Sequence, residues 1–238
     1  MAIGLSLMFG VRLPQNFASP YKAGSMIDFW RRWHMTLSRF LREYLYIPLG
    51  GNRGSPWRRH ANLMITMLLG GLWHGAGWTF VAWGGLHGLY LMINHGWRAA
   101  CVRQPRMASA FAGWRGRLLT FAAVVVAWVF FRAESFAVAA HMIEAMAGLS
   151  SATGAATADE NWRRGALLIA LLAACAWWMP NVCELFRQEK PALPTAVAPF
   201  PTRLAWRASP RWIIASGLFL AAGIMTFHRN SPFLYFQF

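Results

Sequence analysis

The chain has 238 residues, of which 57% are hydrophobic and 13% are charged, and its formal net charge is +15. Soluble domains are about 45–50% apolar and about 25% charged, so this composition argues against an ordinary soluble domain and favours a membrane protein. The basic residues are scattered through connectors between apolar runs, which indicates contact with membrane lipids and no nucleic acid partner. Three cysteines without metal-ligand spacing indicate neither a disulfide framework nor a zinc site.

Residues 28–46 have the 3.6-residue period of an amphipathic helix. The apolar face predicted for this helix holds Trp30, Trp33, Leu37, Phe40, Leu41, Tyr44 and Leu45. A basic amphipathic helix rich in aromatic residues is typical of the membrane interface, and we expect this helix to lie there. His34 falls inside the apolar arc, where an imidazole needs a partner.

The segment that follows, 48–54, is rich in turn-forming residues. Its backbone N–H groups and Arg53 could bind a phosphate. Its glycines do not match a known phosphate-loop spacing, so a simple turn is the favoured interpretation.

Residues 61–94 contain no Lys, Arg, Asp or Glu, but they contain His74 and His87. Since one crossing needs about 20 residues, this stretch predicts two helices, or one crossing and a re-entrant piece, with a break at the glycines around His74. An ionisable group at membrane depth is a functional-site candidate, although a histidine packed between helices is the alternative. His87 lies between Gly84 and Gly88, a GxxxG spacing that favours close helix contact and a structural role.

Three further apolar runs are short for a crossing and must borrow flanking residues to span. Arginine-rich connectors are predicted to be cytoplasmic by the positive-inside rule, and the connector that also carries acidic residues is predicted to face outward. The sequence therefore predicts an all-α, multi-pass membrane protein. The apolar runs are 118–131, 166–179 and 212–227, the cytoplasmic connectors are 98–117 and 181–211, and the outward connector is 132–164.

Two histidines on adjacent apolar elements, His34 and His74, suit acyl transfer. One imidazole can take the proton from an attacking hydroxyl, and the second can orient the acyl carbonyl or the first ring. Metal or haem binding is the competing use, but no HxxxH or HExxH pattern is present, so it ranks lower.

Four motifs occur in order along the chain: FWRRWHMTLS at 29–38, YLYIPLGGNR at 44–53, LWHGA at 72–76 and PFLYFQF at 232–238. Together they resemble the membrane-bound O-acyltransferase (MBOAT) family, above all its bacterial alginate O-acetyltransferase branch and, more distantly, the D-alanyl transfer protein of teichoic acid modification. The resemblance implies a partial MBOAT-like helical bundle. It also implies that His74 is the family's invariant catalytic histidine and that His34 is its second active-site position.

The resemblance further implies an active site in a tunnel through the bacterial inner membrane. The tunnel joins a cytoplasmic acyl donor, acetyl-CoA or an acylated carrier, to hydroxyls of an exported polysaccharide such as alginate. No bound cofactor or metal is expected, and acetyl-transfer proteins outside the membrane are expected partners. The candidate substrate-binding residues are Trp73, Arg32, Asn52 and Arg53.

Members of this family are longer than this chain, which resembles their C-terminal half. The expectation that follows is that the 238 residues alone insert in the membrane without transferring acyl groups. The alternative to an O-acyltransferase is a truncated, inactive membrane scaffold of a polysaccharide-modification complex.

Overall fold

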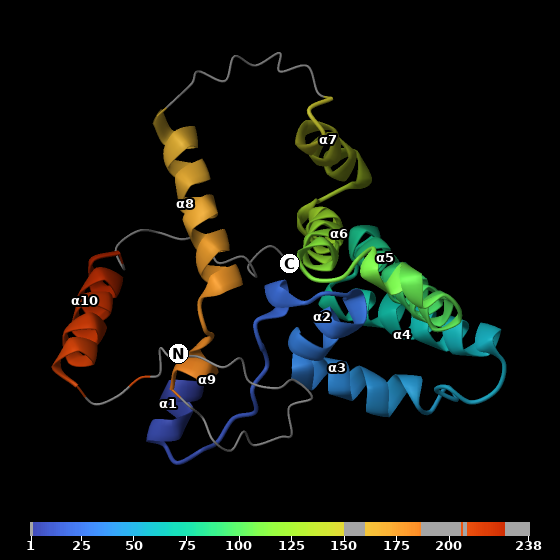
Figure 1. Cartoon of the computed structure of the whole chain (residues 1–238), viewed down its shortest axis with the longest axis horizontal. Helices are drawn as coiled ribbons and strands as arrows, with labels where there is room; N and C mark the ends of the chain where they lie inside the picture. The colour runs from blue at the N-terminus through green and yellow to red at the C-terminus, as the bar shows by residue number, and fades with distance from the viewer. Residues whose placement is uncertain (1, 150–159, 187–205, 207–208, 227–238) are drawn as a thin grey trace. The chain divides into compact units, whose positions relative to one another are not determined.

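The computed structural model describes residues 2–149, 160–186, 206 and 209–226, and every regular element among them is helical. The chain divides into two compact units, one formed by residues 1–179 and 191–198 and the other by residues 180–190 and 199–238. The final motif, 232–238, lies outside the described residues. Figure 1 labels the helices in chain order.

The amphipathic segment predicted as one helix over 28–46 is interrupted twice. Its three parts are α2 (Met26–Arg32), α3 (Met35–Leu41) and the π-helical turn η2 (Arg42–Tyr46). The first break lies at His34, whose φ of 43° places it in the left-handed region. The prediction of one continuous helix was therefore wrong. Phe40 and Tyr44 of the predicted apolar face are 52% and 65% exposed, so they are not part of the protein core.

Helices α4 (Pro56–His74) and α5 (Trp78–Arg103) form an antiparallel pair joined by a three-residue turn, so the break falls at the predicted glycines (Figure 1). The two backbones touch. A Cβ added at Gly84 would collide with the carbonyl oxygen of Met67, and one at Gly71 would collide with that of Phe80. The close helix contact predicted from the GxxxG spacing is therefore confirmed.

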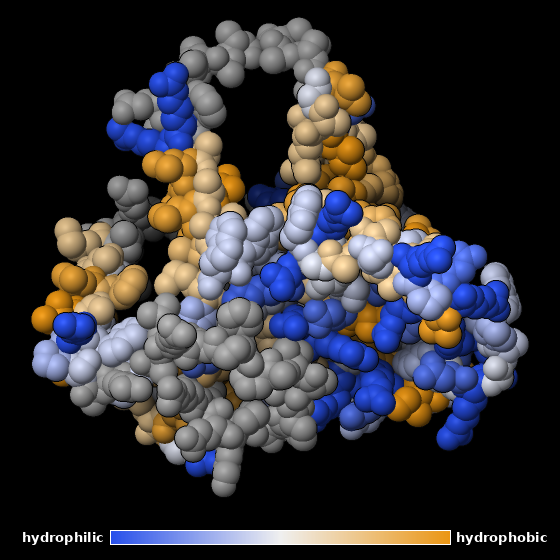
Figure 2. Space-filling model, in the orientation of Figure 1, coloured by the Kyte–Doolittle hydropathy of each residue, from blue (hydrophilic) through white to orange (hydrophobic). Residues whose placement is uncertain are grey.

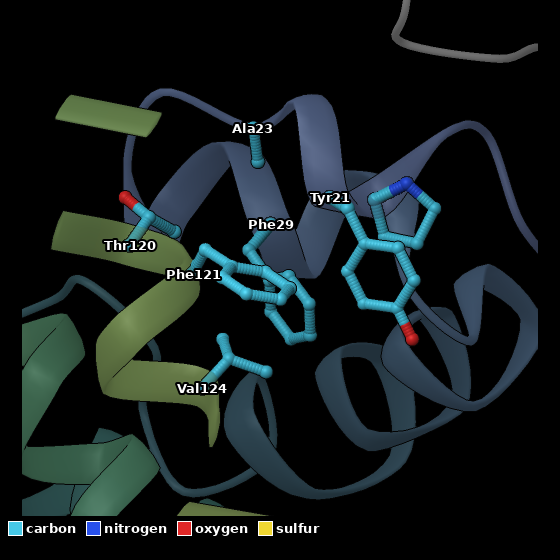
Figure 3. Close-up of a pocket in the computed structure, with 7 residues that line it drawn as sticks. Tyr21, Ala23, Phe29, Thr120, Phe121 and Val124 are labelled. Carbon is cyan, nitrogen blue, oxygen red and sulfur yellow. The ribbon is translucent and has the colours of Figure 1, made fainter. Parts of the chain in front are cut away.

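Helix α6 (Trp114–Arg132) packs on α5 and on the short helix η1 (Pro20–Lys22). In Figure 3, Tyr21, Phe29 and Phe121 converge from η1, α2 and α6 around a recess too narrow to admit a water molecule. The surrounding core consists of Ala23, Met26, Phe29, Met67, Leu91 and Val124. This core fixes α2, and with it the position of His34, against α4–α6.

Among the described residues, α6 is the one helix long and apolar enough to cross a membrane. It covers the predicted run 118–131, and α8 and α10 contain most of the other two predicted runs. The remaining helices are α1 (Ala2–Met8), η3 (Pro105–Ser109), α7 (Phe136–Met146), α8 (Glu160–Trp178), α9 (Val182–Leu185) and α10 (Pro210–Thr226).

Candidate active site

The break between α2 and α3 presents His34. A non-glycine residue in the left-handed region stores strain of about 1–3 kcal/mol and persists only where the surroundings impose it. Asn16 imposes this conformation through three hydrogen bonds to the residues that follow His34. Its carbonyl oxygen accepts the N–H of Met35 at 2.9 Å, and its side-chain oxygen accepts the N–H and the hydroxyl of Thr36 at 3.1 and 3.0 Å. Asn16 thus caps α3 in place of His34, whose side chain makes no cap hydrogen bond.

The His34 ring is half-buried among aromatic rings. Its centroid lies 5.9 Å from that of Phe17 and 6.5 Å from that of Trp73. Its Nδ1 is buried and has no hydrogen-bond partner among the described residues. Burial lowers the pKa of His34 below its ordinary value, which favours the neutral imidazole at neutral pH.

His74 is the last residue of α4, directly before the turn to α5. Three aromatic rings from three helices surround it. The ring centroids of Trp73, Trp83 and Phe131 lie 4.9, 5.2 and 5.1 Å from that of His74. These apolar walls shield one side of a half-buried imidazole.

The structure brings His34 and His74 together. The Trp73 ring lies edge-on to both imidazoles, and the two imidazoles lie within electrostatic range of each other. Trp73 is itself 63% exposed, so the pair is accessible at this end of α4. One neutral imidazole beside a second is an arrangement suited to proton transfer and orientation of a reacting hydroxyl.

Two of the other predicted substrate-binding residues, Asn52 and Arg53, are not brought to this pair, and Arg32, two residues before His34, has partners on α2 and at Ala18. The Arg32 guanidinium bonds the Asp28 carboxylate at 2.9 Å and the carbonyl of Ala18 at 3.4 Å. Asn52 and Arg53 are exposed at the opposite end of α4, about 27 Å away at about 1.5 Å per residue.

The segment 48–54 is a simple turn, as favoured. The N–H groups of Leu49, Gly50, Gly51 and Arg53 all donate to backbone carbonyls, which are those of Leu45, Ile47, Tyr46 and Gly50 respectively. Binding of a phosphate by these four N–H groups is therefore excluded as the turn stands. The amide of Asn62 ties the turn to α4 by donating to the carbonyl of Gly51 at 3.2 Å.

Sequence reasoning missed Asn16, Trp83 and Phe131, which hold or surround the two histidines. Each belongs to a different element from the histidine it contacts, and no periodicity or spacing connects them. The three free cysteines lie elsewhere, and the described residues contain no group of three or more His, Cys, Asp or Glu suited to a metal ion.

His87 is completely buried one layer deeper. Its ring stacks on Phe29 at 6.0 Å and meets Trp30 and Trp83 edge-on at 5.2 and 4.8 Å. Trp83 also packs on His74, so its indole contacts both imidazoles. This position favours a structural role for His87.

Comparison with known proteins gives a family. Residues 1–139 match the model of the membrane-bound O-acyltransferase family. The chain is 49% identical to a peptidoglycan O-acetyltransferase of Helicobacter pylori over 63% of the chain and 28% of that protein. It is 37% identical to the probable alginate O-acetylase AlgI of Pseudomonas aeruginosa over 100% of the chain and 52% of that protein.

A more distant relative is the teichoic acid D-alanyltransferase of Streptococcus thermophilus, 35% identical over 40% of the chain and 25% of that protein. The chain spans about half the length of the alginate relatives that it matches throughout. The family match covers both histidines and the three helices around them. The chain belongs to the membrane-bound O-acyltransferase family.

Proposed function

We propose that this chain carries the histidine pair of a membrane O-acyltransferase that acetylates hydroxyls of an exported polysaccharide. The observation that carries the proposal is that His34 and His74, from different helices, both contact the ring of Trp73. The relatives include a peptidoglycan O-acetyltransferase and a probable alginate O-acetylase, which favours a bacterial cell-surface polymer as acceptor.

In the proposed reaction, His74 is the general base. Its free ring nitrogen takes the proton of the acceptor hydroxyl while the hydroxyl oxygen attacks the carbonyl carbon of the acyl donor. The bond from that carbon to the donor breaks, and the leaving group regains the proton from the imidazolium. The product is an ester on the polysaccharide.

In this proposal His34 is a positioning residue, which orients the reacting groups and does not itself take the proton. A neutral imidazole at this place can orient the acyl carbonyl or the His74 ring without adding a competing charge. The apolar walls from α4, α5 and α6 exclude water, which protects the donor from hydrolysis.

The proposed setting is the bacterial inner membrane, crossed several times. The acyl donor, acetyl-CoA or an acylated carrier, reaches the site from the cytoplasm, and acetyl-transfer proteins outside the membrane hand the ester onward or present the acceptor. The connectors 98–117 and 181–211 face the cytoplasm, and 132–164 faces outward, as their arginine content favours.

The test is a chromosomal His74→Ala substitution in the bacterium that encodes the chain, with ester-linked acetate on the exported polysaccharide as the measurement. We expect a loss of about 10²–10⁴-fold at an unchanged membrane level of the protein. The matched control is His141→Ala, since this histidine on α7 is exposed and pairs only with Glu144 in its own helix.

Unchanged acetylation in the His74→Ala strain would contradict the proposal and leave a membrane scaffold as the function. Equal losses of acetylation in the His74→Ala and His141→Ala strains would mean that the substitutions act on the folding or the amount of the protein. His74 would then have no support as the general base. Absorption spectroscopy of the purified protein tests the haem alternative independently.

A further inference from the structure

The end of the α4–α5 pair opposite His74 gathers positive charge. In the helix contact, Gly71 faces Gly84, and a Cβ at Gly88 would lie 3.4 Å from the Cβ of Met67. Seven residues, or about two turns, from Met67 toward the start of α4 lies His60. Seven residues from Gly88 toward the end of α5 lies His95. The register of the pair therefore brings these two histidines level with each other.

Arginines flank both histidines. Arg59 Nη2 lies 3.4 Å from His60 Nε2, and the charges of Arg59 and Arg98 both reach His95. Arg58 lies against the preceding turn, where a Cβ at Gly50 would be 3.6 Å from its Nε. We call Arg58, Arg59, His60, His95 and Arg98 the cationic cluster.

No carboxylate balances the cationic cluster from its own helices. The sequence contains no Asp or Glu between Glu43 and Glu134, a stretch that includes the turn, α4, α5 and α6. The ion pairs found among the described residues involve other groups, on α2, α3 with η2, and α7. Figure 2 shows hydrophilic residues gathered over this end of the helix pair, and hydrophobic ones over α7.

Arg59 adds a donor without an acceptor. Its Nε is buried and has no hydrogen-bond partner among the described residues. A buried donor on a charged group is costly to leave unpaired, and an anionic oxygen is the acceptor that a guanidinium fork fits best. The first turn of α4, capped by Ser55, adds the positive end of a helix dipole nearby.

We propose that the cationic cluster binds a phosphate group. Three arginines supply positive charge and forked donors, and two imidazoles and a helix start add further N–H donors for the oxygens of a phosphate. The phosphate can belong to the headgroup of an anionic lipid or to a soluble phosphorylated ligand, because both present the same oxygens. The α4 residues of the cationic cluster lie about 21–24 Å from His74 along the helix, so this site is separate from the histidine pair.

The experiment uses the purified chain in nanodiscs of phosphatidylcholine, with two probes. One arm replaces a third of the lipid by phosphatidylglycerol, and the other adds coenzyme A to discs of phosphatidylcholine alone. Binding is measured as the saturable rise in melting temperature. We expect Arg59→Gln to weaken binding about fivefold and Arg59→Gln with Arg98→Gln about 25-fold.

Arg106→Gln is the matched control, since it removes one exposed arginine from η3, outside the cationic cluster. It should leave binding unchanged. Arg59→Lys, which keeps the charge but loses the guanidinium fork, should bind more weakly than the unmodified protein and more tightly than Arg59→Gln. The melting temperature in phosphatidylcholine discs without probe shows whether each variant is folded.

A response to phosphatidylglycerol alone assigns the site to a lipid headgroup, and a response to coenzyme A alone assigns it to a soluble phosphate. The proposal is overturned if neither probe gives saturable binding. It is also overturned if Arg106→Gln weakens binding as much as Arg59→Gln does. Because coenzyme A is also part of one proposed acyl donor, its response counts for the cationic cluster only where Arg59→Gln weakens it. The roles of His34 and His74 are tested separately, by acetylation in the cell.

Discussion

The backbone contact between α4 and α5 makes Gly84→Ala the sharpest perturbation available. The new methyl carbon would overlap the carbonyl oxygen of Met67, which is backbone and cannot rotate away. The helices must therefore separate, and a gap of about 0.5–1 Å already forfeits about a quarter to a half of each dispersion contact along the interface.

The expected cost follows from two opposing terms. Overpacking of this kind costs about 1–3 kcal/mol, and replacing glycine by alanine inside a helix returns up to about 1 kcal/mol. The net destabilisation is about 1–2 kcal/mol, which corresponds to a fall in melting temperature of roughly 2–8 °C for a chain of this length.

Gly84→Ala should also reduce acyl transfer. Trp83 precedes it and packs on His74 at 5.2 Å, so separating the helices displaces one wall of the site. A misplacement of about 1 Å can cost about 10²-fold in rate. The assays are thermal unfolding of the purified protein and ester-linked acetate on the polysaccharide of the chromosomal variant.

Gly85→Ala is the matched control, one residue along the same helix. A Cβ there would lie 3.5 Å from Leu68 Cδ2, an ordinary contact with a flexible side chain. It should melt at or slightly above the temperature of the unmodified protein and keep its activity. Equal melting temperatures for Gly84→Ala and Gly85→Ala would refute the backbone contact and the reasoning built on it.

His34→Ala should reduce acetylation in the cell by less than His74→Ala does, because His34 positions and does not itself take the proton; wild-type acetylation would leave it a packing residue. Asn16→Ala should cost about 0.5–2 kcal/mol by uncapping α3 and should lower activity through His34, whereas Asn16→Asp keeps the acceptor and most of both. His87→Gln should keep most activity at a lower melting temperature, because the stacked ring is lost; complete inactivity at a normal membrane level would place His87 in the chemistry. In a protein without its native cysteines, Leu149→Cys should react with an impermeant maleimide from outside, and reaction only from the cytoplasm would invert the topology.

The sequence alone predicted those features of the helices that depend on residues close together in the chain. The glycines around His74 predicted the break between α4 and α5, and the GxxxG spacing predicted their close contact, since both depend on residues within one short stretch. The break at His34 was not predicted because residues 28–46 contain no sequence signal for a helix break at that position. Asn16, eighteen residues earlier, imposes the left-handed conformation through three hydrogen bonds.

The candidate site was predictable only in part for the same reason. An imidazole on an apolar face is visible in the sequence, so both histidines were identified, and the structure places them around Trp73. The walls supplied by Trp83 and Phe131 arise from the packing of α5 and α6 on α4, which no pattern within one helix encodes. Arg53 was predicted from its motif neighbours and lies at the far end of α4.

The acid-free stretch between Glu43 and Glu134 also determines how the helix pair responds to an energised membrane. When the cytoplasm is electrically negative, moving one positive charge outward across the membrane costs about 2.3 kcal/mol per 100 mV. Moving Arg58, Arg59 and Arg98 across the membrane therefore costs about 7 kcal/mol at 100 mV. No carboxylate in the stretch offsets this work. On the proposed topology, with both ends of the hairpin in the cytoplasm, the membrane potential opposes their movement outward, and dissipating it during synthesis should remove that restraint on insertion.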